Sequence, residues 1–185
     1  MTNTIPTGEL FENRVVVWSI EASRRLFKEA YYGKPLGIPK PKDFEFDAPL
    51  ILDLMEGYYL VRKKKLRVED RDGNAIKAKN LEKACTQSYS DFGAKYLVYS
   101  LLKESGYVVA PGIKFGTDFA VYEHGPGIDH APYIIEVRRV GSDITATDMV
   151  LSGRLATTVR KQFIIAVVDE ASEKVDFLSF DWWRA

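Results

Sequence analysis

Cysteine is nearly absent from this sequence, since Cys85 is the only one in a chain of 185 residues. A single cysteine forms no disulfide within the chain, which excludes the small secreted domains that disulfides hold together and fits a reducing compartment. Cys85 stands in the helix-like run AKNLEKACTQS, where a buried thiol is a commoner role than a nucleophile. We therefore expect Cys85 to pack in a core.

Long apolar runs are also missing, so no segment has the length that a membrane-spanning helix needs. The first residues, MTNTIPTGELFEN, lack the basic start and the apolar core of a signal peptide. These two absences favour a cytoplasmic protein.

An excess of positive charge is missing as well, because 26 lysines and arginines stand against 26 aspartates and glutamates. Proteins that bind nucleic acid usually carry a basic excess, so this balance counts against nucleic acid as a partner. It is compatible with such a partner if basic residues cluster on one face, or if acidic surface docks another subunit.

What is present is an ordinary globular composition, 46% hydrophobic and 28% charged, in a length that allows one large or two small domains. Before Gln87 the patterns predict a buried strand, a helix that Gly33 stops, a helix running into a strand, and a short helix that follows a turn at Asp72-Gly73. In order, these elements are residues 14–18, 21–32, 48–60 and 77–87. We place a domain boundary near Gln87.

After Gln87 the sequence predicts a helix, a mixed sheet and one helix that crosses it, which is an α/β arrangement. Ser88 or Ser90 would cap the first helix, and Gly106 would end it. The apolar face of this helix would consist of Tyr96, Leu97, Leu101 and Leu102. The expected strands are residues 107–110, 118–122, 133–140, 163–168 and 175–180, and the crossing helix is residues 145–160.

Residues 34–47 carry three prolines and cannot form a regular helix or a central strand. A loop of this length inside a compact domain is uncommon and often functional. Its lysines, Lys34, Lys40 and Lys42, form a basic cluster that could meet a phosphate, although a solvated connection is the alternative. A second basic run, formed by Lys63, Lys64, Lys65 and Arg67, is another candidate for contact with RNA, but acidic residues follow it at once and a solvated strand edge is the commoner role of such a run.

Three residues of the second half could carry chemistry. Tyr122 ends a strand before a Gly-Pro-Gly loop, His130 follows a turn-rich segment, and Lys161 lies between a helix and a strand. Each alone has an ordinary structural explanation. Together, a phenol, an imidazole and an ammonium without a carboxylate pair point to proton transfer and charge stabilisation. They do not suggest a metal cage, and we expect no metal and no cofactor.

The order of these residues carries a resemblance to a known family. KFGTDFAVY ends at Tyr122, His130 follows, and an Arg-Lys pair ending at Lys161 opens an apolar strand. This pattern resembles the archaeal tRNA-splicing endonucleases (tRNA-intron lyases), and in particular catalytic subunits of the crenarchaeal type. The likeness includes KYLVY in the preceding helix and extends more loosely over the N-terminal half. It implies a small mixed N-terminal α/β domain, residues 1–87, and a restriction-endonuclease-like catalytic domain, residues 88–185, with a mixed central sheet flanked by helices.

The resemblance implies excision of introns from precursor tRNA by attack of a ribose 2′-hydroxyl on its own phosphate, without a metal. Tyr122 would be the general base, His130 the general acid, and Lys161 would stabilise the charge of the phosphorane. A free tyrosine has a pKa near 10, so the base role requires nearby positive charge, for which Lys161 is the candidate. Ala131 stands where the family often has serine, and the spacing from tyrosine to histidine is shorter than in some relatives. His124 is the competing histidine, but it lies only two residues after Tyr122, where the family is variable, so His130 is preferred.

The same resemblance implies contacts to RNA and to other subunits. Arg154 with Trp183 or Arg184 would hold a flipped base, and Lys40 or Lys42 in the proline-rich loop would reach the RNA. Asp169, Glu170 and Glu173 would form an acidic loop that docks into another subunit. We expect a heterotetramer with a non-catalytic paralogue, or otherwise a homotetramer, with precursor tRNA as the substrate and no membrane.

Two other functions remain open from the sequence. Asp118 with Glu136 and Arg138 faintly resembles the metal site of restriction-type nucleases, although arginine replaces the usual lysine. The chain could also be a non-catalytic, RNA-binding subunit of the same complex. Such paralogues typically lose the three residues that this chain keeps.

Overall fold

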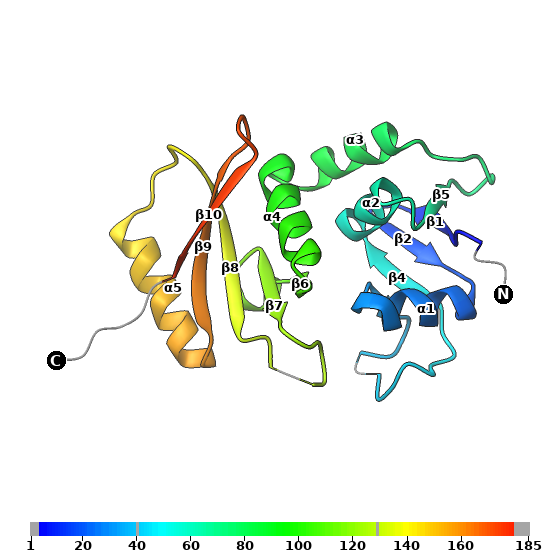
Figure 1. Ribbon diagram of the computed structural model, residues 1–185, viewed down its shortest axis with the longest axis horizontal. Helices are drawn as coiled ribbons and strands as arrows, with labels where there is room; N and C mark the ends of the chain where they lie inside the picture. Colours follow the sequence, from blue (N-terminus) through cyan, green and yellow to red (C-terminus); the bar gives the residue numbers. More distant parts are fainter. Residues whose placement is uncertain (1–3, 40, 129, 180–185) are drawn as a thin grey trace. The chain divides into compact units, whose positions relative to one another are not determined.

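The structure is a computed structural model that describes residues 4–39, 41–128 and 130–179. The chain forms two compact units, Met1–Phe92 and Gly93–Ala185 (Figure 1). The boundary expected near Gln87 lies in the last turn of a helix, α3 (Ala78–Ser88), close to this division. Within the described residues, no helix combines the length and the apolar character needed to cross a lipid bilayer.

The first unit is built on a five-stranded sheet with the order β3-β4-β2-β1-β5. Its strands are β1 (Thr7–Phe11), β2 (Arg14–Val17), β3 (Lys34–Pro35), β4 (Leu50–Asp53) and β5 (Arg67–Glu69). Only the pair of β1 and β5 is parallel among the described strands of this sheet. Helices α1 (Ile20–Ala30) and α2 (Leu54–Arg62) pack against the sheet, and α3 packs on α2.

Between β4 and α2 the chain runs from strand to helix, so the expected order of helix and then strand is wrong. Leu50 and Leu52, two residues apart in β4, are both fully buried, which is the spacing of one face of a strand. Asp53 then caps α2, and Glu56 reaches back so that its carboxylate accepts a hydrogen bond from the Asp53 amide at 2.8 Å. This capping box determines where the strand stops and the helix begins.

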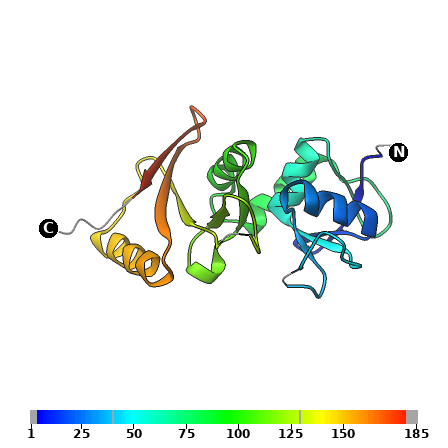
Figure 2. The same ribbon diagram turned by 60° about the horizontal axis from the view of Figure 1, so that its bottom comes forward.

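The second unit contains a mixed sheet with the order β10-β9-β8-β7-β6. Its elements are α4 (Phe92–Glu104), β6 (Val108–Pro111), the short 3₁₀ helix η1 (Ile113–Phe115), β7 (Phe119–Tyr122), β8 (Tyr133–Arg139), α5 (Ala146–Val159), β9 (Gln162–Asp169) and β10 (Lys174–Ser179). Strands β8 and β9 are parallel and α5 connects them, whereas the other neighbours are antiparallel. Figures 1 and 2 show α4 and α5 on opposite sides of this sheet.

This arrangement confirms the expected fold class, a mixed α/β protein whose second sheet is flanked by helices. The core of the second sheet contains Ile134, Phe163 and Ile165 from its two parallel strands, which are all buried. The apolar face expected for α4 is wrong in one respect, because Leu101 is 41% exposed. Ala94 and Val98, together with Leu102 in the next turn, form the buried face instead, at the four-residue spacing of one helix side.

Candidate active site

The register of the second sheet brings three chain segments to the same edge. Strand β7 ends at Tyr122, and its neighbour Val121 pairs with Tyr133 at the start of β8. Because β8 and β9 are parallel, Tyr133 in turn pairs with Gln162, the first residue of β9. The end of β7 and the starts of β8 and β9 therefore lie side by side, although they are far apart along the chain.

Lys161, directly before β9, is held at this edge by backbone oxygens. Its Nζ donates a hydrogen bond to the carbonyl of His130 at 2.8 Å and another to the carbonyl of Ala131. The same Nζ lies 5.1 Å from the centroid of the Phe115 ring, a cation–π contact. The structure thus brings Lys161 against the segment that carries His130.

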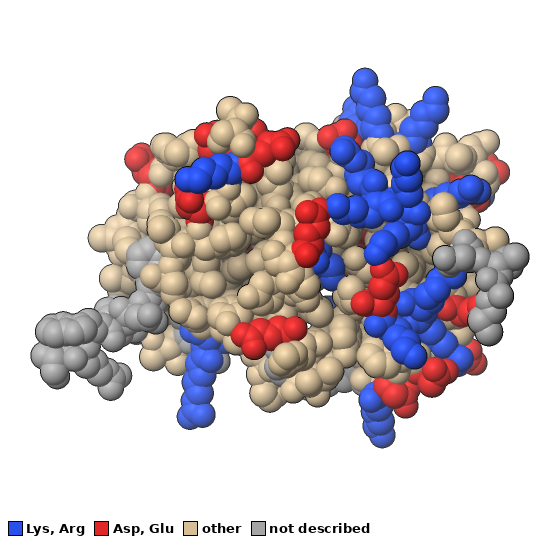
Figure 3. All heavy atoms as spheres, viewed as in Figure 1, with Lys and Arg blue, Asp and Glu red and all other residues tan. Residues whose placement is uncertain are grey.

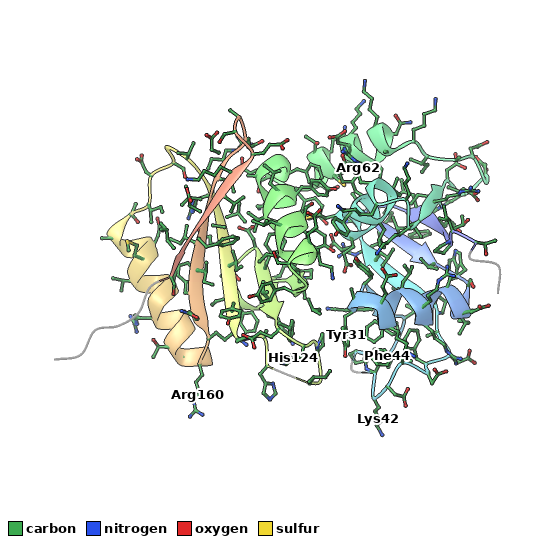
Figure 4. The ribbon with its side chains drawn as sticks, viewed as in Figure 1. Tyr31, Lys42, Phe44, Arg62, His124 and Arg160 are labelled. Carbon is green, nitrogen blue, oxygen red and sulfur yellow. The ribbon has the colours of Figure 1, made fainter. Side chains whose placement is uncertain are left out.

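The other two predicted residues lie at the same edge with different exposure. Tyr122 is half-buried at the end of β7, whereas His130 is exposed in the loop before β8. The competing histidine, His124, is also exposed, and Figure 4 shows its ring pointing away from the sheet.

Two contacts around this edge were missed by the sequence analysis. The Tyr133 hydroxyl donates a hydrogen bond to the Glu123 carboxylate at 2.7 Å, which ties the residue after Tyr122 to the start of β8. This hydrogen bond is the main cause that raises the pKa of Tyr133. The second contact is that of the Phe115 ring with Lys161. Phe115 belongs to the KFG motif, which could have indicated it from the sequence.

Asp118, one of the residues of the metal-nuclease alternative, braces β7 between two other elements. Its Oδ1 forms a 2.8 Å ion pair with Lys95 of α4, and its Oδ2 accepts a 2.8 Å hydrogen bond from the Val137 amide of β8. Glu136 pairs with Arg138 on its own strand. Within the described ranges, histidine, cysteine and carboxylate side chains form no group of three that could hold a metal ion.

The proline-rich loop, residues 34–47, is anchored by aromatic rings. Phe44 lies 5.9 Å from Phe27 and 5.6 Å from Tyr31 between ring centroids, and Phe46 is buried beside Phe27. Lys42 is exposed, and Figure 4 shows it extending away from these rings. Lys40 lies outside the described residues. The loop therefore has a fixed base and presents Lys42 to solvent.

The residues expected to hold a flipped base are only partly described. Arg154 is exposed on α5, where its backbone carbonyl accepts a hydrogen bond from the Thr158 hydroxyl. Trp183 and Arg184 lie outside the described residues.

Of the expected docking residues, Asp169 is the last residue of β9, and Glu170 and Glu173 lie in the turn between β9 and β10. Two of the three have partners within the unit. Asp169 accepts hydrogen bonds from the Ser172 hydroxyl, at 2.7 Å, and from the Ala171 amide, and these bonds lower the pKa of its carboxyl. Glu170 forms a 2.7 Å ion pair with Arg139. Glu173 is exposed and has a positive φ of 53°.

Comparison with known proteins assigns this architecture to a family. Residues 92–177 match the tRNA intron endonuclease catalytic C-terminal domain, and residues 7–81 match the tRNA intron endonuclease N-terminal domain. The chain belongs to the tRNA intron endonuclease family. It is therefore an endonuclease, and the resemblance seen in the motif around Tyr122 is confirmed at the level of the family.

Full-length relatives from crenarchaea support the assignment. The chain is 43% identical to a tRNA-splicing endonuclease of Hyperthermus butylicus over 169 residues, which cover 91% of this chain and 93% of the relative. It is 40% identical over 178 residues to the tRNA-splicing endonuclease of Sulfurisphaera tokodaii, covering 96% and 98%. A tRNA-splicing endonuclease of Saccharolobus solfataricus is 37% identical over 174 residues, covering 94% and 96%. The likeness to this intron endonuclease family thus extends over both domains.

Proposed function

We propose that this intron endonuclease cleaves precursor tRNA by attack of the ribose 2′-hydroxyl next to the scissile phosphate. Breakage of the bond to the 5′-oxygen then leaves a 2′,3′-cyclic phosphate and a 5′-hydroxyl. Because the nucleophile belongs to the substrate, its proximity to the phosphorus is already provided and no metal-bound water is needed.

In this mechanism Tyr122 removes the proton of the 2′-hydroxyl, and His130 donates a proton to the departing 5′-oxygen. Lys161 stabilises the additional negative charge on the phosphorane oxygens. The observation that supports these roles best is the hydrogen bond from Lys161 to the carbonyl of His130, at the sheet edge where β7 ends in Tyr122. A phosphate bound at this edge would have a cation and two titratable groups on neighbouring segments.

We further propose that RNA is gripped outside the three cleavage residues. Arg154 would stack on an unpaired base together with Trp183 or Arg184, since guanidinium and indole planes both stack on bases. Lys42, or else Lys40, would meet an RNA phosphate from the proline-rich loop. The aromatic anchoring of that loop supports Lys42 in particular, because an ammonium on a fixed base loses less freedom on binding.

The proposed assembly is a heterotetramer with a non-catalytic paralogue, with a homotetramer as the alternative. Asp169, Glu170 and Glu173 would dock into a basic groove of another subunit. The edge strand β10 also supports assembly, because Phe177 and Leu178 on it are 41% and 46% exposed. Exposed apolar residues on an unpaired edge are typical of surfaces that another chain covers.

The test is cleavage of an intron-containing precursor tRNA by the full chain, alone and with candidate partner subunits, in excess EDTA. Direct labelling of the downstream fragment by a polynucleotide kinase would identify the 5′-hydroxyl, and a 2′-deoxy nucleotide at the scissile position should block cleavage. Tyr122→Phe, His130→Ala and Lys161→Ala should each lower the single-turnover rate by roughly 10²- to 10⁴-fold. RNA affinity should change little.

His124→Ala is the matched control, because it removes the neighbouring histidine and should leave the rate near that of the unmodified chain. Equal losses for His124→Ala and His130→Ala would contradict the assignment of the acid. Loss of RNA binding in parallel with cleavage would favour the non-catalytic binding subunit. Cleavage that disappears in EDTA and returns with Mg²⁺ would favour the metal-dependent nuclease instead.

A further inference from the structure

Basic side chains gather over α2 and α3 of the first unit (Figure 3). We call the five exposed residues at the end of α2 and along α3 the α2–α3 basic surface: Arg62, Lys63, Lys64, Lys79 and Lys83. The proposed function gives these residues no role.

The two helices form one surface because they are joined through Tyr58. The Arg62 guanidinium donates a hydrogen bond to the Tyr58 hydroxyl at 3.1 Å. Burial raises the pKa of Tyr58, and the hydrogen bond from Arg62 opposes that rise. A hydrogen bond with the Glu82 carboxylate on α3 raises the same pKa, so Glu82 also lies close to the Tyr58 hydroxyl. Arg62 therefore lies next to α3, and the one carboxylate between Lys79 and Lys83 is engaged toward α2.

The lysines of α3 point away from its packed side. Leu81 and Cys85 are fully buried, and Lys79 and Lys83 lie two residues to either side of Leu81. Two residues correspond to about 200° around a helix, so both lysines project opposite Leu81 and lie next to each other, one turn apart. Over the described part of the chain, Lys64, Lys79 and Lys83 form no salt bridge. Their charge is thus available to a ligand.

The chemistry of this surface fits a phosphate backbone better than a protein or an unpaired base. From Arg62 to Ser88, all of which are described, no large hydrophobic side chain is exposed. Protein interfaces have apolar and aromatic centres and are depleted in lysine. Binding of single strands relies on exposed aromatic platforms for the bases. Flexible lysines that have neither an apolar centre nor an aromatic platform beside them neutralise phosphates and make no sequence-specific contacts to bases.

We propose that the α2–α3 basic surface binds the phosphate backbone of a double-helical segment of the RNA substrate, as a contact separate from the groups that cleave it. This inference rests on the proposed function, because it assumes that the substrate is RNA. A local basic surface of this kind also lets a chain of zero net charge bind RNA. The first unit would then contribute affinity for the body of the precursor, and the second unit would contribute the chemistry.

The test uses the full chain, with any partner subunit that it requires, carrying K64Q, K79Q and K83Q together. A matched control carries R25Q, K28Q and R71Q, which remove the same charge from exposed positions of the first unit outside this surface. Two substrates are compared in single-turnover cleavage: the complete precursor tRNA, and a minimal hairpin that keeps the cleavage sites but only a few flanking base pairs. Binding of the complete precursor is measured as a function of salt.

The surface variant should require on the order of tenfold to a hundredfold more enzyme for half-maximal cleavage of the complete precursor, and should cleave the minimal hairpin as the unmodified chain does. Its slope of log affinity against log salt should fall by about 2 to 3, since each lost phosphate contact removes about 0.9.

Unchanged affinity and slope of the surface variant would overturn the inference. Equal losses on both substrates, or equal losses in the control variant, would also overturn it. Altered subunit assembly at unchanged RNA affinity would also overturn it and would identify a protein partner. Failure of the unmodified chain to cleave either substrate would instead count against the proposed function, because the binding measurement does not depend on cleavage.

Discussion

Asp118 offers a decisive perturbation because it holds together three elements around the candidate site and is also the central residue of the metal-dependent alternative. Asp118→Asn keeps the shape of the side chain and one acceptor oxygen. It removes the charge that pairs with Lys95 at 2.8 Å and weakens the hydrogen bond from the Val137 amide. Because β7 carries Tyr122, loosening this brace acts on the strand that presents the proposed base.

The magnitude follows from the burial of the pair. The side chains of Lys95 and Asp118 are 18% and 19% exposed, so their interaction is worth more than the 0 to 1 kcal/mol of a surface pair and less than that of a fully buried one. A hydrogen bond to a charged acceptor contributes about 1.5–3 kcal/mol, and a neutral amide oxygen keeps roughly half of it. Together these terms predict a loss of about 2–3 kcal/mol in the free energy of unfolding. In a unit of this size, the midpoint of thermal unfolding should fall by on the order of 10 °C.

The assay is thermal unfolding followed by circular dichroism, with Asp176→Asn as the control. Asp176 also forms an ion pair, with Lys174 at 2.9 Å, but the Lys174 side chain is 67% exposed and the Asp176 side chain 59%. Asp176→Asn should therefore change the free energy of unfolding by less than about 0.5 kcal/mol. A double-mutant cycle with Lys95→Met should yield a coupling energy of about 1–2 kcal/mol. If Asp118→Asn and Asp176→Asn have equally small effects on the free energy of unfolding, the structural role of Asp118 is refuted.

Activity measured below the unfolding midpoint separates the two mechanisms. If Asp118 is structural, Asp118→Asn should cleave RNA in EDTA within about tenfold of the unmodified rate. If it is a metal ligand, the same variant should be inactive even where it is fully folded. A folded and inactive variant would therefore refute the structural role that the ion pair with Lys95 indicates.

Three further predictions concern the first unit. Glu56→Gln should lower the free energy of unfolding, measured by chemical denaturation, by about 1–3 kcal/mol. The reason is that the buried Glu56 carboxylate accepts hydrogen bonds from the amides of Gly33 and Asp53, at 3.0 and 2.8 Å. An effect no larger than that of Glu12→Gln, at an exposed position, would contradict this prediction. Burial raises the pKa of the Cys85 thiol to about 12, so iodoacetamide at pH 8 should label the chain only after unfolding, and labelling of the native chain would show that the thiol is accessible. Phe44→Ala should cost about 1–2 kcal/mol and speed proteolysis within residues 34–47, because two aromatic contacts at 5.6 and 5.9 Å anchor that loop; unchanged cleavage kinetics would mean that the rings do not order it.

Much of the secondary structure could be predicted from short-range patterns. The helix over residues 77–87 and the strand over 163–168 were predicted within a few residues, since apolar spacing and flanking turn residues determine both. The segment at 48–60 was predicted in the reverse order because its apolar residues fit either a strand or a helix. What decides the order is the capping box between Asp53 and Glu56, a local hydrogen-bonding signal that outweighs apolar content.

The arrangement of the candidate site could be predicted only in part, because its contacts depend on pairing between distant strands. Tyr122, His130 and Lys161 were found through a family motif, which records that they belong together but not how they are held. The ammonium of Lys161 is held by the carbonyls of His130 and Ala131, and Ala131 has a positive φ of 23°, which alanine rarely adopts. Every residue has a backbone carbonyl oxygen, so the sequence does not show which of these oxygens will accept a hydrogen bond from Lys161. The side chains proposed for the chemistry could therefore be named from the sequence, whereas the frame that positions Lys161 became visible only through the parallel register of β8 and β9.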